Sequence, residues 1–295
     1  MCRSRRENRL TMARMAPVDP TLLHSAFLEA FADYAMDASG TTEDRLLLRM
    51  KKNAVDYGVS PGLYDEDRLV GFTLIGIDSW GGSLTAYDAG TGIVPEFRRQ
   101  GWARKLFDHA LPALRERGVE QFALEVLQQN QPAIKAYRKS GFEIVRKLRC
   151  YAAAVEELRS RIDSSVLEIR PIDRQTFSRL EPSADWLPSF ENRFTALDAI
   201  DTNVQMFGAF DDETCVGGLA YSPPLKWLLS LLVDREYRRR GVGTLLLQHL
   251  AKQLSDSSTR LSALNVDTSD GGMPSFLTDL GFEHLVDQYE MQREL

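Results

Sequence analysis

The chain has 295 residues, about twice the usual length of one domain, so its length predicts two domains. Hydrophobic residues make up 43% of the chain and charged residues 26%, a composition that excludes an intrinsically disordered protein. The formal charge of −6 is shared unevenly, with +3 on residues 1–150 and −9 on the rest. The acidic second half is therefore a poor surface for nucleic acid.

Neither a membrane nor an oxidising compartment is indicated. The longest strongly apolar stretch, 225–233, contains Lys226 and is too short to span a bilayer. The basic segment 1–9 is not followed by the apolar core of a signal peptide, so we interpret it as a tail that precedes a start at Met12 or Met15. The three cysteines are far apart and odd in number, which fits a reducing cytoplasm.

The first half predicts strands and helices in alternation, because its apolar spacing switches between the two periods. A short apolar run at 10–15 comes first. After it we expect helices at 21–34 and 43–55, a hairpin at 63–70, strands at 69–77 and 84–94, a helix at 99–117, a strand at 121–127, a helix at 132–140 and a strand pair at 142–151.

The second half repeats this order. It begins at 166–171, and we expect strands near 205–211, 214–222 and 226–233, a helix at 240–255, a strand at 261–266, a short helix and closing strands. Two local matches confirm the repeat at one offset of 140 residues: Gly101 matches Gly241 inside an arginine-rich segment, and Gly141-Phe142 matches Gly281-Phe282. The chain is therefore a tandem duplication.

These patterns predict an α/β (α+β) fold in two similar domains, each a mixed, mostly antiparallel sheet flanked by helices. We place the first domain at 1–152, a polar connector at 153–163 and the second domain at 164–295.

The junction Arg98-Arg99-Gln100-Gly101-Trp102-Ala103 joins a predicted strand to a long helix. The first turn of a helix has unpaired N–H groups and a partial positive charge, and a glycine lets a phosphate approach that backbone. Taken alone, the junction is equally typical of a tight turn beside a solvated basic face.

A second segment, at 130–142, decides between these two interpretations of the junction. The junction has the pattern R-x-x-G-x-[AG], and 130–142 reads N-x-x-A-x-x-x-Y-x-x-x-G-F. Together they resemble the GCN5-related N-acetyltransferase (GNAT) family, and the order of elements extends the resemblance over both halves.

The resemblance implies acetyl-CoA as co-substrate, and no metal. The backbone of Ile93 and Val94 would contact the pantetheine arm, and Asn130 would contact that arm or fix the next helix. The pyrophosphate would lie on the loop residues Arg98, Arg99, Gln100, Gly101, Trp102, Ala103 and Arg104.

The resemblance also implies two catalytic residues. Tyr137 would protonate the leaving thiolate, a role that suits a phenol with a pKa near 10. Asp88 would act as the base, directly or through water. Alternatively, Asp88 orients the amine or pairs with an arginine, and Glu125 on the neighbouring strand is the second candidate base.

The second half keeps the loop but not these groups. The positions 140 residues beyond Asn130 and Tyr137 are Asp270 and Leu277, and strand 227–233 has no acidic residue. We therefore expect a degenerate second copy that acts as a structural partner, a lid, or a vestigial or regulatory CoA site.

The predicted function is transfer of an acetyl group from acetyl-CoA to a primary amine, on a small molecule or a peptide, in the cytoplasm. Two alternatives stay open. One is an enzyme like mycothiol synthase, a tandem member in which the second copy performs the chemistry. The other is an acyl-CoA sensor without turnover. We expect neither nucleic acid nor a membrane as partner.

Overall fold

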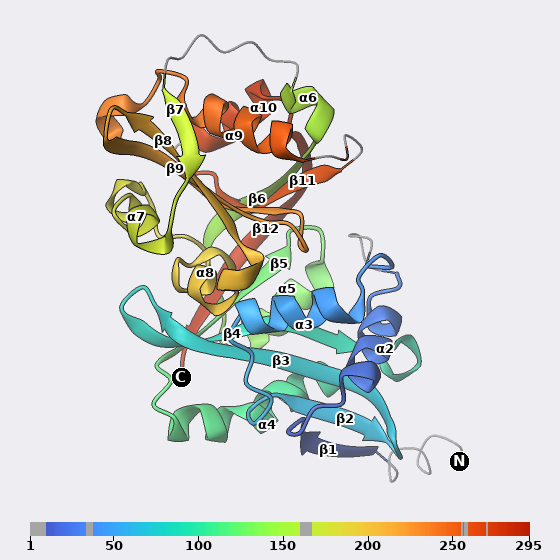
Figure 1. Ribbon diagram of the computed structural model, residues 1–295. Coiled ribbons are helices and arrows are strands. Elements are labelled where there is room, and N and C mark those ends of the chain that lie inside the picture. The colour runs from blue at the N-terminus through green and yellow to red at the C-terminus, as the bar shows by residue number, and fades with distance from the viewer. Residues whose placement is uncertain (1–9, 34–37, 160–166, 255, 257–258, 270) are drawn as a thin grey trace. The chain divides into compact units, whose positions relative to one another are not determined.

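The computed structural model describes residues 10–33, 38–159, 167–254, 256, 259–269 and 271–295. These residues group into two compact units of similar size. The first unit comprises residues 1–126, 130–145 and 291–295, and the second comprises 127–129 and 146–290. Each unit has its own set of strands and helices (Figure 1).

The sheet of the first unit has the strand order β1-β2-β3-β4-β5. Its strands are β1 (Leu10–Arg14), β2 (Pro61–Asp65), β3 (Arg68–Trp80), β4 (Ser83–Ile93) and β5 (Gln121–Leu127). Neighbours pair antiparallel from β1 to β4, whereas β5 runs parallel to β4. The predicted acidic hairpin turn lies between β2 and β3, where Glu66 has a positive φ of 57°.

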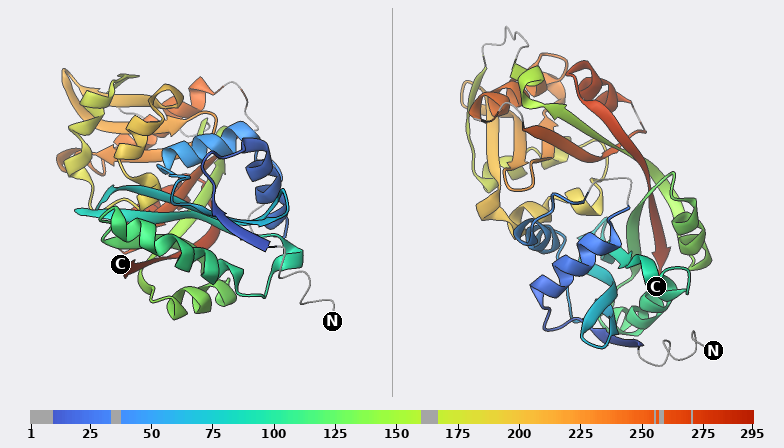
Figure 2. Two further views of the ribbon diagram at one scale, coloured as in Figure 1. Left: turned by 90° about the horizontal axis from the view of Figure 1, so that it is seen from below. Right: turned by 90° about the vertical axis from the view of Figure 1, so that its right-hand side faces the viewer.

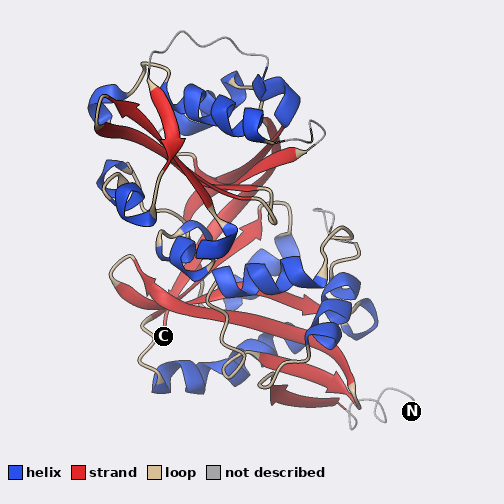
Figure 3. Ribbon diagram, viewed as in Figure 1, coloured by secondary structure: helices blue, strands red, loops and turns tan. Residues whose placement is uncertain are grey.

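Helices cover both faces of this sheet (Figure 3). The helices α2 (Pro20–Ala30) and α3 (Glu43–Lys52) lie on one face, and α4 (Trp102–Glu116) lies on the other (Figure 1). The α2 helix starts at Asp19, whose carboxylate accepts bonds from the N–H groups of Thr21 and Leu22. The α5 helix (Gln131–Lys139) follows β5.

The second unit repeats this arrangement. Its strands are β6 (Glu143–Ala154), β7 (Glu168–Pro171), β8 (Gln205–Asp211), β9 (Thr214–Ser222), β10 (Trp227–Val233), β11 (Arg260–Asp267) and β12 (Glu283–Glu294), and their order is β12-β6-β11-β10-β9-β8-β7. As in the first unit, one parallel pair, β10 with β11, stands among antiparallel neighbours. Its helices are α6 (Val155–Arg159), α7 (Arg174–Ser178), α8 (Thr195–Ala199), α9 (Val242–Gln253) and α10 (Gly272–Asp279). This architecture confirms the predicted fold class.

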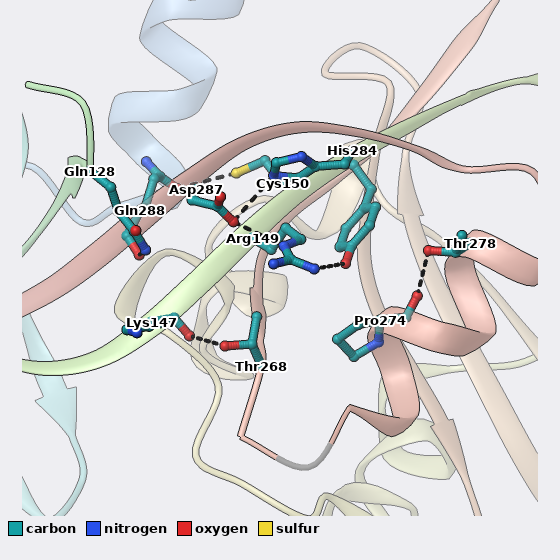
Figure 4. A network of polar contacts seen from close by, with 11 residues as sticks. Gln128, Lys147, Arg149, Cys150, Thr268, Pro274, Thr278, His284, Asp287 and Gln288 are labelled. Carbon is teal, nitrogen blue, oxygen red and sulfur yellow. Dashed lines mark hydrogen bonds and ion pairs between the residues drawn. The ribbon is translucent and has the colours of Figure 1, made fainter.

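The strands β6 and β12 are equivalent in the repeat and lie side by side (Figure 2). Arg149 of β6 pairs with Asp287 of β12, with 2.9 Å between Nε and Oδ1 (Figure 4). Each strand has 12 residues. Residues 143–145 and 291–295 group with the first unit, and the rest of both strands groups with the second. The compact units therefore divide the chain differently from the predicted ranges 1–152 and 164–295, which follow the sequence repeat.

Several predicted elements need correction. The expected strand pair at 142–151 is the single strand β6, which runs on to Ala154, so the connector proposed at 153–163 begins inside a strand and continues as α6; its residues 160–163 lie outside the described ranges. The helix expected from Arg99 begins only at Trp102, because Arg99 and Gly101 have φ values of 62° and 77°, which a right-handed helix excludes. Tyr34, the expected end of the first helix, also lies outside the described residues.

Candidate active site and acyl-donor loop

The loop between β4 and α4 is built from alternating backbone conformations. Arg99 and Gly101 lie in the left-handed region, and α4 begins directly after them. The first intrahelical bond of this end joins the N–H of Lys105 to the carbonyl of Gly101, at 3.2 Å. Such a sequence of conformations turns successive N–H groups toward one point and forms a concave anion site. The backbone from Arg99 to Arg104 thus has the geometry expected of a phosphate loop.

The side chain of Arg98 is held by contacts within the protein. Its Nε donates to the carbonyl of Ile93 at 3.0 Å, and Nη2 donates to the carbonyl of Ala30 at 2.9 Å. Its guanidinium also pairs with Asp33 at 2.6 Å, and this hydrogen bond lowers the pKa of the Asp33 carboxyl. Arg98 therefore ties the start of the loop to β4 and α2.

The predicted backbone contacts at the end of β4 are already engaged. The N–H of Val94 donates to Val70, and the carbonyl of Val94 accepts from Phe97, both at 3.0 Å. The carbonyl of Ile93 accepts from Arg98.

The side chains of the loop residues differ in exposure. Those of Arg99, Gln100 and Arg104 are exposed, and Arg104 contacts Asp108 at 3.5 Å. Ala103 is half-buried. Trp102 is buried, and its indole N–H donates to Gln100 at 3.3 Å. Arg99 and Arg104 can add charge at the loop, whereas Trp102 anchors the helix start.

The middle of β4 is irregular. Its register against β3 shifts by one residue at Ala89, which is a β-bulge. The parallel pairing of β4 with β5 covers 85–87 with 121–123 and ends one residue before Asp88. The side of β4 from Asp88 onward is thus the place where the two parallel strands part.

Asp88 is a buried carboxylate with three hydrogen-bond donors. Its oxygens accept from the N–H of Gly90 at 3.0 Å, the hydroxyl of Thr91 at 2.9 Å and the hydroxyl of Tyr137 at 3.2 Å. Burial raises its pKa to about 6, against the opposing effect of these bonds. At pH 7 the group is therefore mostly ionised, yet it is a far stronger base than an exposed aspartate.

Tyr137 reaches Asp88 from α5. The edge-to-face contacts of its ring with Phe107 and Phe142, at centroid distances of 5.8 and 5.7 Å, fix the direction of the hydroxyl. The helix itself is capped by Asn130, whose side chain accepts from the N–H of Ala133 at 3.2 Å. The structure thus brings the two predicted catalytic residues into contact, and it gives Asn130 the role of fixing the helix.

Glu125 has a partner of its own. Its Oε2 accepts from the hydroxyl of Tyr87 at 2.5 Å, so the neighbour of Asp88 in sequence binds the second candidate base. Sequence reasoning did not find Thr91 and Asp33. The hydrogen bond of Thr91 depends on the bulge of β4, and Asp33 lies 65 residues before the arginine that it pairs with.

The second unit has the same loop geometry. Arg239 and Gly241 have φ values of 60° and 83°, and Arg238 donates to the carbonyls of Val233 and Ser183 and pairs with Asp185 at 2.7 Å. A bulge at Leu229 is equivalent to the one at Ala89. At the positions of Asp88 and Tyr137, however, the second unit has the buried Leu228 and Leu277. Asp270, the counterpart of Asn130, lies outside the described residues.

A model of the acetyltransferase (GNAT) family matches the chain twice, at residues 22–142 and 166–282. The chain belongs to this family. Membership confirms the predicted family and its tandem arrangement, and the family is one of acetyltransferases.

Two curated acetyltransferases match part of the chain. A streptothricin acetyltransferase of Streptomyces lavendulae is 40% identical over 74 residues, which are 25% of this chain and 38% of that protein. An N-alpha-acetyltransferase 30 of Schizosaccharomyces pombe is 34% identical over 88 residues, which are 30% of this chain and 59% of that protein. The matches therefore span between about two fifths and three fifths of the length of these relatives.

Solved structures match over nearly the whole chain and show the tandem fold. A tandem GNAT protein from the clavulanic acid biosynthesis pathway, solved without acetyl-CoA, has a TM-score of 0.73 and 19% identity, and the match covers 97% of this chain and 98% of that one. A GCN5-related N-acetyltransferase from Sphaerobacter thermophilus has a TM-score of 0.74 and 13% identity, with 97% and 96% covered.

Within the described ranges, no group of three His, Cys, Asp or Glu side chains is arranged to hold a metal ion. In the same part of the chain, no helix is long and apolar enough to cross a membrane. That no metal takes part stays a prediction.

Proposed function

We propose that the first unit transfers the acetyl group of acetyl-CoA to a primary amine by direct attack. The observation that carries the proposal is the contact between Tyr137 and Asp88, 3.2 Å apart, at the point where β4 and β5 part. A buried base and a phenol in contact can move protons in both directions during one reaction.

The proposed reaction needs a proton acceptor and a proton donor, and each role is assigned to one residue. The neutral amine attacks the thioester carbonyl, and Asp88 accepts the proton that the new ammonium loses. Tyr137 donates its proton to the sulfur as the C–S bond breaks. The hydrogen bond between the two then returns the proton from Asp88 to the phenolate of Tyr137, so the pair ends the reaction as it began. The products are an amide and CoA in its thiol form.

The donor fits the loop between β4 and α4. The N–H groups of the first turn of α4 and the exposed Arg99 and Arg104 would hold the pyrophosphate. At Gly101 a Cβ atom would point into open space, and φ is 77° there, so the residue leaves the approach to the backbone clear. Trp102 and Ala103 contribute N–H groups rather than side-chain contacts.

The acceptor is proposed as an amine on a small molecule or on a peptide, because the names of the two curated relatives point to one of each kind. The two cysteines in the described part of the chain, Cys150 and Cys215, are not joined in a disulfide, which supports the proposed cytoplasmic setting. Nucleic acid and membrane lipids are not proposed as partners.

The experiment is incubation of the protein with acetyl-CoA and a panel of amines and peptide N-termini. Product mass and release of CoA are followed together. The proposal expects at least one acceptor to gain an acetyl group with equal release of CoA. Binding of acetyl-CoA without transfer to any acceptor would favour the alternative of a sensor.

A further inference from the structure

The last five residues of the chain, 291–295, belong to the first unit. In the sequence they come at the end of the second copy of the repeat, and most of them form the end of β12, yet they group with the first unit. The N–H of Leu295 donates to the carbonyl of Glu120 at 3.0 Å. The unit that contains the proposed acid and base therefore includes a segment from the far end of the chain.

Arg293, in this segment, holds the end of helix α5. Its Nη1 donates to the carbonyl of Ser140 at 2.6 Å, and its guanidinium lies over the ring of Phe142, 5.8 Å from the centroid. Ser140 is the C-cap residue of α5, and the last carbonyls of a helix have no partner inside the helix. A cation at this end satisfies such a carbonyl and interacts favourably with the helix dipole.

The turn that Arg293 holds is bonded directly to Tyr137. The N–H groups of Ser140 and Phe142 both donate to the carbonyl of Tyr137, at 2.9 and 3.1 Å. The rings of Phe142 and Tyr137 also pack edge to face, 5.7 Å apart. Backbone bonds and a ring contact thus connect Arg293 to Tyr137. The bond from the Tyr137 hydroxyl to Asp88 is long, at 3.2 Å, so a small displacement of the ring would break it.

The position of Arg293 is electrostatically unfavourable. Burial and the positive charge of Arg115 lower the pKa of Arg293, and the negative charge of Asp108 opposes this effect. An exposed arginine would be solvated and would not meet these costs. The guanidinium is therefore held by its contacts with Ser140 and Phe142 against an unfavourable environment.

The equivalent position of the repeat differs in the same way as the tyrosine does. The offset of 140 residues relates Arg293 to Ala153 of β6. Ala153 is fully buried and lies in one hydrophobic core with Leu277, the counterpart of Tyr137. The arginine thus accompanies the helix that carries a phenol, and the alanine accompanies the helix that carries a leucine.

We propose that Arg293 is a positioning residue for the acetyl transfer: it fixes the end of α5 so that the hydroxyl of Tyr137 stays in contact with Asp88. This inference rests on the proposed function. It adds that the activity of the first unit depends on the last residues of the chain, so the first copy of the repeat is not a self-sufficient enzyme.

The kinetic test is a double-mutant cycle of Arg293→Met and Tyr137→Phe in the full chain. We expect Arg293→Met to lower kcat about tenfold through misplacement of the proton donor, with an unchanged KM for acetyl-CoA, because the loop between β4 and α4 is untouched. In the Tyr137→Phe background the same change should lower kcat by less than about twofold, since no hydroxyl remains to be positioned. Arg293→Lys, which keeps a charged donor, should restore most of the wild-type kcat.

The matched control is Arg115→Met. Arg115 is an exposed arginine in the last turn of α4 whose charge acts on Arg293. Its removal leaves the bond from Arg293 to Ser140 in place, so kcat should stay within about twofold of the wild type. Melting curves confirm that each variant is folded.

A second measurement needs no turnover. The ¹³Cζ NMR signal of Tyr137, assigned by its loss in Tyr137→Phe, reports the hydrogen bonding of the phenol. We expect this signal to shift in Arg293→Met and to stay in place in Arg115→Met.

The proposal is overturned if folded Arg293→Met keeps the wild-type kcat, if the losses of the two single variants add up in the double variant, or if the Tyr137 signal does not move. If the wild type itself transfers no acetyl group, the proposed function fails. The Tyr137 signal then still decides whether Arg293 positions the hydroxyl, so the two failures are distinguishable.

Discussion

Asp88 and Tyr137 form a pair whose chemistry depends on burial. Asp88 is 8% exposed, and its contact with Tyr137 joins β4 to α5. The ring of Tyr137 is fixed by two phenylalanines, so loss of the hydroxyl alone leaves the packing intact. Both residues could be predicted from the resemblance, but their contact could not. It depends on the register of a bulged strand and on a helix 49 residues away.

The change Tyr137→Phe removes the proposed proton donor. We expect kcat to fall about 100-fold or more, the usual scale for an acid–base residue, with an unchanged melting temperature. The matched control is Tyr87→Phe, which removes the hydroxyl that binds Glu125. A large loss in Tyr87→Phe and a small one in Tyr137→Phe would make Glu125 the better candidate base.

In the proposed mechanism, the pKa of Asp88 sets the pH dependence of the reaction. Because burial raises it to about 6, the base form is gained as the pH rises through 6. We therefore expect kcat/KM to rise toward pH 7 with an apparent pKa near 6, and Asp88→Asn to remove this step together with most of the activity. A profile that keeps its step in Asp88→Asn would assign the step to another group.

As the pH rises, the stability of the fold should change in the opposite sense to the activity. Since the folded-state pKa of Asp88 is above its ordinary value of 3.8, the ionised carboxylate destabilises the fold above pH 6, and this cost disappears below pH 4. Thermal melting of Asp88→Asn should thus show a higher Tm than wild type at pH 8 and a similar Tm at pH 4. A lower Tm at pH 8 would mean that the bonds from Thr91 and Gly90 outweigh the cost of burial.

At the scale of elements, strands and helices with a clear period were predicted closely. The strand β5 matches its predicted range, and α5 is displaced by one residue. The start of α4 was misplaced because the left-handed conformation of Arg99 is not visible in a pattern of apolar spacing. The segment 172–204 was left unassigned, since its helices α7 and α8 have five residues each and too few turns to show a period.

The hydrogen bonds of the Arg98 side chain, which form the arginine clamp, link the loop between β4 and α4 to β4 and α2. Arg98→Ala should raise KM for acetyl-CoA about tenfold or more with a smaller effect on kcat, because it releases the carbonyls of Ile93 and Ala30 together with Asp33. Asp33→Ala is the control. It removes only an ion pair with an exposed partner, which is worth little, so KM should change less than threefold. Equal effects in both variants would show that the ion pair, not the carbonyl bonds, holds the loop.

At the scale of the whole molecule, one fold occurs twice with different site residues. The loop, the bulge and the arginine clamp are present in both units, whereas the acid–base pair is present at 88 and 137 and replaced by leucine at 228 and 277. The repeat and the loss of the pair were visible in the sequence. A cavity of the second unit, lined by residues from 183–194, 228–244 and 263–280, was not, because it depends on how these three stretches pack.

The central claim is that the first unit performs the transfer. The most direct measurement is steady-state acetyl transfer by Gly101→Val and Gly241→Val, since both glycines have a left-handed φ and the same substitution strains both loops alike. We expect Gly101→Val to show no detectable transfer. The activity of Gly241→Val should be at least ten times that of Gly101→Val. Loss of transfer in Gly241→Val with activity retained in Gly101→Val would contradict the claim and assign the reaction to the second unit.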